Sequence, residues 1–172
     1  MIQIHFDISE SITIDQSLPK EEKYKALLPQ IESLVEGENN VIANLGNICS
    51  ALKYNMDKFF WVGFYLRKGD ELILGPFQGP VACTRIQLPR GVCGTAVKEK
   101  KTIIVDDVNK FPGHIACSSE SKSEIVVPVF TGDEVIAVLD VDSDYYSSFD
   151  ETDKIYLEKV AQLVSTIIYS GK

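Results

Sequence analysis

Two strand–turn–strand patterns constrain the fold of this chain more than any other feature. The first joins an aromatic-rich segment, residues 59–66, to residues 71–74 across a Lys-Gly-Asp turn. The second joins residues 124–130 to residues 135–142 across a Thr-Gly-Asp turn. Short apolar segments separated by glycine-containing turns are typical of β-hairpins. The two patterns therefore predict an antiparallel sheet.

Helical periodicity occurs on both sides of the hairpins. Apolar residues recur at helical spacing in residues 24–35, in residues 41–52 and near the C-terminus. Pro29 is expected to kink or split the first helix, and Asn39 or Asn40 to cap the second. This order of elements predicts an α+β fold with a central antiparallel sheet. The N-terminal helices and the C-terminal helix would pack on one face, and the active-site loops would lie on the other.

The length and charge of the chain exclude several classes of protein. With 172 residues it has the length of one domain, and we assign residues 1–17 to an N-terminal arm and residues 18–172 to a single domain. Its net charge of −8 argues against binding to nucleic acids or anionic membranes. The first residues lack the features of a signal peptide, and no apolar stretch has the length of a membrane span. We expect a cytoplasmic protein.

Three acidic residues are predicted to meet at one end of the sheet. Because side chains alternate along a strand, Asp140 and Asp142 share one face, opposite Leu139 and Val141. Glu124 begins the partner strand, beside the end of the strand that carries Asp142. Three like charges this close cannot all ionise, so at least one pKa should rise. The trio could bind an ammonium group and donate a proton, or it could be a solvated acidic edge.

Two aromatic residues occupy the same face of the first predicted strand. Trp61 and Tyr65 lie at alternating positions with Gly63 between them. They could be ordinary core residues. They could also form the two walls of a pocket with a glycine floor, which would suit a methyl or cationic group.

The four cysteines are too few for a disulfide scaffold in a chain of this length. Cys49 lies on a helical apolar stripe and is expected to be a buried, inert thiol. Cys93 begins a short helix beside Arg90, where a thiolate or a bound carboxylate would be stabilised. Cys83 begins a strand, and Cys117 lies in a long polar loop, where a redox thiol can be exposed.

A metal site is the main alternative for these cysteines. Cys83, Cys93, Cys117 and His114 could together form a zinc site. The cysteines are scattered singly, however, without the paired spacing of a zinc knuckle. A protease-like Cys–His pair has no further support in the sequence. We therefore expect no metal and no other cofactor.

Five segments together resemble a known family, the free methionine-(R)-sulfoxide reductases, which are single GAF-type domains. The resemblance covers roughly residues 20–165 and includes the three cysteines with their flanking motifs, the acidic trio and Trp61. The segments are FFWVGFYL, LILGPFQGPVACTRI, RGVCGTAV, GHIACSSESKSEIVVPV and VIAVLDVDS.

The resemblance implies reduction of free methionine-(R)-sulfoxide to methionine by thiol chemistry. The acidic trio suits the substrate ammonium and can supply a proton to the sulfoxide oxygen. Trp61 and Tyr65 suit the S-methyl group, and the backbone N–H groups near Cys93 suit the carboxylate. A GAF sensor that binds a small ligand or an oxidant without turnover is the alternative function.

Within the family pattern we assign Cys117 as the nucleophile and Cys83 as the resolving cysteine. Cys93 is an alternative resolver or a relay. Attack on the substrate would leave a sulfenic acid, which a second cysteine converts to a disulfide for reduction by a thioredoxin-like dithiol.

Self-association is also expected from the helices. Residues 24–35 and the C-terminal helix carry broad apolar stripes, of which one sheet face can bury only part. A symmetric homodimer through these helices is the predicted result, because two-fold dimers are the commonest soluble oligomers.

Overall fold

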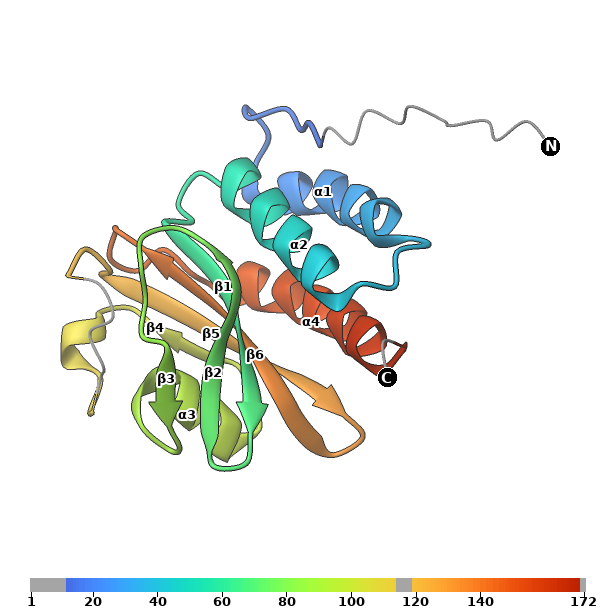
Figure 1. Ribbon diagram of the computed structural model, residues 1–172. Helices are drawn as coiled ribbons and strands as arrows, with labels where there is room; N and C mark the ends of the chain where they lie inside the picture. Colours follow the sequence, from blue (N-terminus) through green and yellow to red (C-terminus); the bar gives the residue numbers. More distant parts are fainter. Residues whose placement is uncertain (1–11, 114–118, 171–172) are drawn as a thin grey trace.

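A six-stranded sheet forms the centre of the computed structural model, which describes residues 12–113 and 119–170 (Figure 1). All its strand pairs are antiparallel, in the order β3-β2-β1-β6-β5-β4. The strands are β1 (Trp61–Lys68), β2 (Glu71–Gln78), β3 (Arg85–Gln87), β4 (Ile103–Val105), β5 (Ser123–Thr131) and β6 (Glu134–Ser143). The helices are α1 (Lys20–Val35), α2 (Val41–Asn55), α3 (Gly91–Glu99) and α4 (Glu151–Ser170), with a short 3₁₀ helix, η1 (Val108–Lys110).

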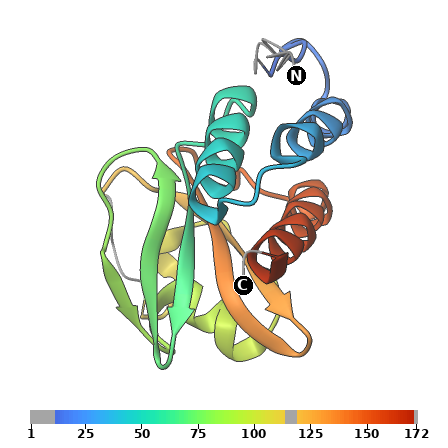
Figure 2. The same ribbon diagram turned by 45° about the vertical axis from the view of Figure 1, so that its right-hand side comes forward.

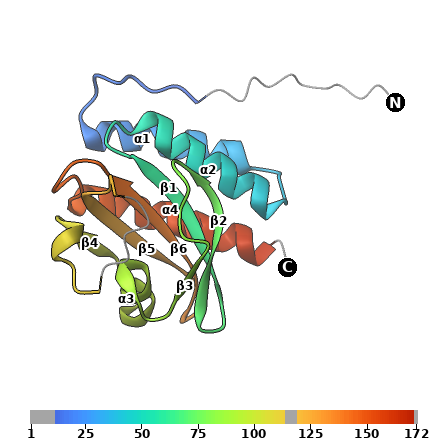
Figure 3. The same ribbon diagram turned by 60° about the vertical axis from the view of Figure 1, so that its left-hand side comes forward.

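The helices divide between the two faces of the sheet. Helices α1, α2 and α4 pack together on one face, whereas α3 lies on the opposite face with the loops around it (Figures 2 and 3). The predicted α+β arrangement is confirmed. Among the described residues, no helix has the length and apolar character needed to cross a membrane.

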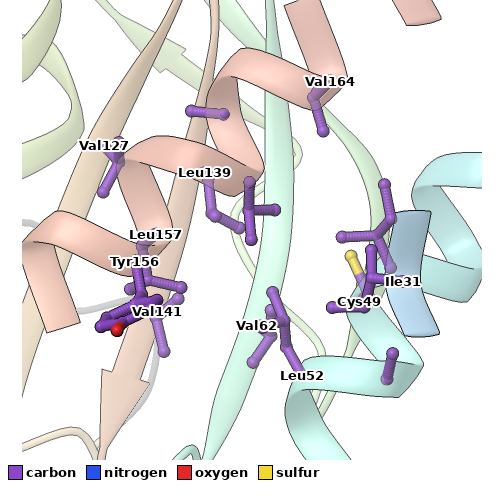
Figure 4. Packing of buried hydrophobic residues seen from close by; sticks show 14 of the residues in the cluster. Ile31, Cys49, Leu52, Val62, Val127, Leu139, Val141, Tyr156, Leu157 and Val164 are labelled. Atoms are coloured by element: carbon purple, nitrogen blue, oxygen red, sulfur yellow. The ribbon is translucent and has the colours of Figure 1, made fainter. Parts of the chain in front are cut away.

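The larger core lies between the sheet and the three helices on its first face. Figure 4 shows residues of the sheet, among them Val62 and Leu139, packed against side chains of all three helices. Cys49 is fully buried in this core, and its thiol donates a hydrogen bond to the carbonyl oxygen of Pro76 at 3.3 Å. The interpretation of Cys49 as a packing residue is confirmed. Ile14 is also buried there, so part of the predicted arm contacts the domain.

Pro29 does not split α1, so this part of the sequence-based expectation is wrong. The helix runs from Lys20 to Val35 with Pro29 on its exposed side. Proline removes one backbone hydrogen bond, but the carbonyl left unpaired on an exposed face can be hydrated. The opposite side of α1 is held by the burial of Tyr24, Leu27 and Ile31. At the start of α2, Asn40 is the capping residue and accepts from the Ala43 amide at 3.0 Å.

The strand β2 also extends further than expected. The sequence predicted a strand over residues 71–74, but β2 continues through Gly75 and Pro76 to Gln78. The register shifts at this point: Gly63 pairs with Phe77 and Tyr65 with Leu74, so Gly75 and Pro76 both lie opposite Phe64. This is a β-bulge, in which an extra residue is accommodated and glycine and proline are tolerated.

Candidate functional site

A pocket opens on the second face of the sheet, at the end where β1, β5 and β6 meet α3. Six of the eight site residues predicted from the sequence line it. Cys83 lies in the segment after β2, and Cys117 lies outside the described residues, as does His114. The predicted residues that line the pocket are Trp61, Tyr65, Cys93, Glu124, Asp140 and Asp142.

The strand register explains how the three acidic residues come together. Asp142 on β6 pairs with Trp61 on β1 and with Glu124 on β5, so these three residues form one row across the sheet. Asp140 occupies the same face two residues earlier, opposite Gly63. Because paired residues in an antiparallel sheet point to the same side, all three carboxyl groups face the pocket. The predicted meeting of the acids is confirmed.

Burial changes the protonation of this trio. Glu124 is 6% exposed and Asp140 is 7% exposed. Burial, followed by the neighbouring carboxylates, raises the pKa of both groups well above their ordinary values. Burial also raises the pKa of Asp142 to about 6, against the opposing effect of a hydrogen bond with Ser121. The alternative of a solvated acidic edge is therefore wrong.

A side-chain hydrogen bond joins Glu124 and Asp140. This hydrogen bond raises the pKa of Glu124 and lowers that of Asp140. The protonated carboxyl of Glu124 is thus the donor and Asp140 the acceptor. The Oδ1 atom of Asp140 is buried and has no hydrogen-bond partner among the described residues. A buried acceptor of this kind is costly unless a ligand supplies a donor.

Cys93 contributes a neutral thiol to the site. It is buried at the start of α3, and its Sγ atom donates a hydrogen bond to Oδ2 of Asp140 at 3.4 Å. Burial and then the carboxylates of Asp140 and Glu124 raise the pKa of Cys93 well above its ordinary value. This is opposite to the direction expected from the helix N-terminus and Arg90, because the thiol is buried and the charged group that it contacts is the Asp140 carboxylate.

Trp61 and Tyr65 form one continuous aromatic wall. Their ring centroids are 6.1 Å apart, and the planes are inclined by 27°. Gly63 lies beneath the indole, since a Cβ atom at this position would be 2.2 Å from Cη2 of Trp61. The sequence suggested that Gly63 forms the floor of a pocket, but the indole of Trp61 covers this glycine. The glycine allows the indole to lie flat against the strand.

The described cysteines do not support the zinc site considered from the sequence. Cys83 is disulfide-bonded and cannot be a thiolate ligand, whereas Cys49 and Cys93 are free thiols. A different group, Cys93, Glu124 and Asp140, has ligand atoms within 4.8 Å of one another and could hold a cation after losing its protons.

Sequence reasoning missed Ser121 as a site residue. Ser121 is 8% exposed, lines the pocket and forms a hydrogen bond with Asp142. Its position just before β5 was the available signal, because Glu124 begins the same strand at the same end of the sheet. The apolar residues Val81, Ala82 and Ile86 also line the pocket.

Comparisons with family models, with known sequences and with solved structures point to the same family. The GAF domain family model matches residues 45–168. The chain is 62% identical to GAF domain-containing protein A of Dictyostelium discoideum, with 84% of this chain and 92% of that protein covered. It is 46% identical to the free methionine-R-sulfoxide reductase of Saccharomyces cerevisiae, with 93% of each covered. The crystal structure of free methionine-R-sulfoxide reductase from Neisseria meningitidis in complex with its substrate has a TM-score of 0.91 and 46% identity, covering 94% of this chain and 97% of that one.

Proposed function

The chain belongs to the free methionine-R-sulfoxide reductases, a family of GAF domains, and on this premise we propose that it reduces free L-methionine-(R)-S-oxide to L-methionine. The observation that carries the proposal is the buried, partly protonated acid group of Glu124, Asp140 and Asp142 beside the aromatic wall. The group offers an acceptor to a cationic ligand and a proton to an oxygen in the same pocket. A sensor without turnover is not favoured, because relatives over nearly the whole chain are named as reductases.

Each part of the substrate has a counterpart in the pocket. The α-ammonium group suits Oδ1 of Asp140, the buried acceptor without a partner in the described residues. The protonated carboxyl of Glu124 suits the sulfoxide oxygen, to which it can donate. The S-methyl group suits the face of Trp61, and the carboxylate suits the N-terminus of α3, where Gly91 and Val92 line the pocket.

The chemistry is a two-step thiol reaction. In the first step the sulfur of Cys117 attacks the substrate sulfur, and the sulfoxide oxygen is transferred to the cysteine, which becomes a sulfenic acid. The substrate sulfur is reduced by two electrons, the cysteine sulfur is oxidised by two, and methionine leaves. In the second step the thiol of Cys83 attacks the sulfenic sulfur, an S–S bond forms and water leaves. The disulfide-bonded state of Cys83, together with the free thiols of Cys49 and Cys93, supports this pairing. Cys93 is then a hydrogen-bond donor to Asp140 rather than a redox residue.

A thioredoxin-like dithiol returns the enzyme to its reduced form. Two electrons enter per cycle through thiol–disulfide exchange, which requires a compartment rich in such dithiols. The cytoplasm meets this requirement, and the reaction there would repair oxidised free methionine.

Turnover of the free amino acid is the first test of the function. The purified chain is expected to release methionine from free methionine-(R)-sulfoxide with dithiothreitol, and much more slowly from the S epimer. The N-acetyl derivative should react about ten- to a hundredfold more slowly, because acetylation removes the charged donor opposite Asp140. Methionine is quantified by chromatography. Equal rates on the free and acetylated substrates would contradict the proposed binding mode.

The protein also forms a homodimer in this proposal. The apolar stripes of α1 and α4 that suggested the dimer are largely buried inside the chain, so a dimer would use the apolar side chains that the helices leave exposed. Ile42 and Tyr54 on α2 and Ile155 on α4 are 60%, 72% and 46% exposed. Covering such residues favours a symmetric partner. Light scattering at micromolar concentration should give the mass of two chains, and the mass of one chain would contradict the dimer.

A further inference from the structure

The segment that carries Cys83 is anchored to the pocket by a tyrosine hydroxyl. Residues 79–84, called the strap here, connect β2 to β3 and form no strand. The hydroxyl of Tyr65 donates a hydrogen bond to the backbone carbonyl oxygen of Cys83 at 3.0 Å. The ring of Tyr65 is 1% exposed, and burial followed by the charge of Asp140 raises the pKa of its hydroxyl. The group therefore stays protonated and remains a donor.

The neighbouring indole anchors the other end of the strap. Nε1 of Trp61 donates to the carbonyl oxygen of Pro80 at 3.0 Å. Gly79 lies directly against the same ring, since a Cβ atom there would be 2.4 Å from Cδ1 of Trp61. A further hydrogen bond to the strap runs from the Leu74 amide to the Thr84 carbonyl at 3.0 Å. Two of these three hydrogen bonds thus come from side chains of the aromatic wall, in addition to the disulfide bond that Cys83 forms.

We propose that the polar ends of Tyr65 and Trp61 position the strap so that Cys83 can close the disulfide. The two side chains then act on both steps: their rings form the pocket wall, and their hydroxyl and N–H groups hold the resolving cysteine. They are positioning residues for the second step. The inference rests on the proposed function, because the position of Cys83 matters to turnover only if Cys83 resolves the sulfenic acid.

The step concerned is the reaction of the Cys83 thiol with the sulfenic acid. The S–S bond forms, the S–O bond breaks, and the proton of the thiol leaves with the hydroxyl as water. The reaction needs the two sulfur atoms to approach bonding geometry, which requires Cα atoms within about 7 Å. A strap released from its anchors spends less time in that geometry, so the sulfenic acid survives longer.

Tyr65→Phe tests the proposal because it retains the ring and removes only the hydroxyl. The full chain is given one equivalent of free methionine-(R)-sulfoxide without reductant, in a fixed concentration of dimedone, which traps sulfenic acid. Mass spectrometry then gives the ratio of trapped protein to disulfide. This ratio depends on how fast the sulfenic acid is resolved and not on how fast it forms.

The variant is expected to raise the ratio of trapped protein to disulfide about three- to tenfold, the range of one neutral hydrogen bond. An unchanged ratio would overturn the proposal, even if methionine release itself slows, because the hydroxyl would then act on substrate binding alone. Tyr156→Phe is the matched control, since that hydroxyl bonds to Glu21 on the other side of the sheet. Its ratio should equal that of the wild type. A wild type that releases no methionine would overturn the proposed function itself.

Gly79→Ala provides a second test that leaves both aromatic residues unchanged. Its Cβ atom would push the strap away from Trp61. Gly69→Ala is the control for backbone strain, since Gly69 also has a positive φ but nothing within 4 Å of an added Cβ atom. The dimedone ratio should rise in the first variant and not in the second. Equal ratios in the two variants would contradict the anchoring role of Trp61.

Discussion

Cys117→Ser is expected to release no methionine, whether the reductant is thioredoxin or dithiothreitol. The nucleophile takes part in every turnover, and a serine hydroxyl at neutral pH does not replace a thiolate. The measurement is methionine released per chain, in a single turnover without reductant and in steady state with each reductant.

Cys83→Ser and Cys49→Ser complete the experiment. Cys83→Ser should fail with thioredoxin but keep a burst of at least one methionine per chain, because methionine leaves before Cys83 reacts. Dithiothreitol can replace Cys83, since a small thiol can attack the sulfenic acid directly. Cys49→Ser should remain active, since its thiol lies in the core on the opposite face of the sheet. A full burst from Cys117→Ser would assign the nucleophile to another cysteine. Cys93 would then be the candidate, although its thiol is buried and its pKa is raised, which both disfavour a nucleophile.

Asp142→Asn is expected to lower turnover about ten- to a hundredfold while making the protein more stable at pH 8. In the proposed binding mode the Asp142 carboxylate, which lines the same pocket, shares the substrate ammonium with Asp140, and asparagine removes that charged hydrogen bond. The gain in stability follows from the pKa of Asp142, which burial raises from 3.8 to about 6. A carboxyl group with a raised pKa favours the folded state below pH 3.8, and this contribution is lost as the pH rises through 6. Asparagine is neutral at every pH, so the variant does not lose this stability as the pH rises.

Urea unfolding at two pH values measures the second effect. The free energy of unfolding of Asp142→Asn should exceed that of the wild type by about 1–3 kcal/mol at pH 8, since one pKa unit corresponds to about 1.4 kcal/mol. The difference should nearly vanish at pH 4. Asp133→Asn, in the exposed turn between β5 and β6, is the control and should change neither quantity. Wild-type turnover in Asp142→Asn would remove this carboxylate from the site, and equal stability at pH 8 would show that its charge is not buried.

The positions of the acids and aromatics could be predicted from the sequence because they depend on local periodicity. Alternation along a strand places Asp140 and Asp142 on one face, and a tight turn brings Glu124 beside them. Both relations are set within a hairpin of about 20 residues. The apolar stripe of α2 placed Cys49 in the core in the same way. The resemblance to the family is the source of the roles proposed for Cys83 and Cys117, which periodicity does not indicate.

Properties that depend on contacts between distant segments required the tertiary structure. Cys93 is neutral because α3 packs its thiol against Asp140, which lies 47 residues away in the chain. The strap is held by Trp61 and Tyr65, 18 to 19 residues earlier. The bulge at Gly75 and Pro76 exists because β2 pairs with β1 on both sides of Phe64 and has one residue more than β1 between these pairs. In each case the sequence determined which groups are present, whereas packing determined their burial, and burial determines their charge and their hydrogen bonds.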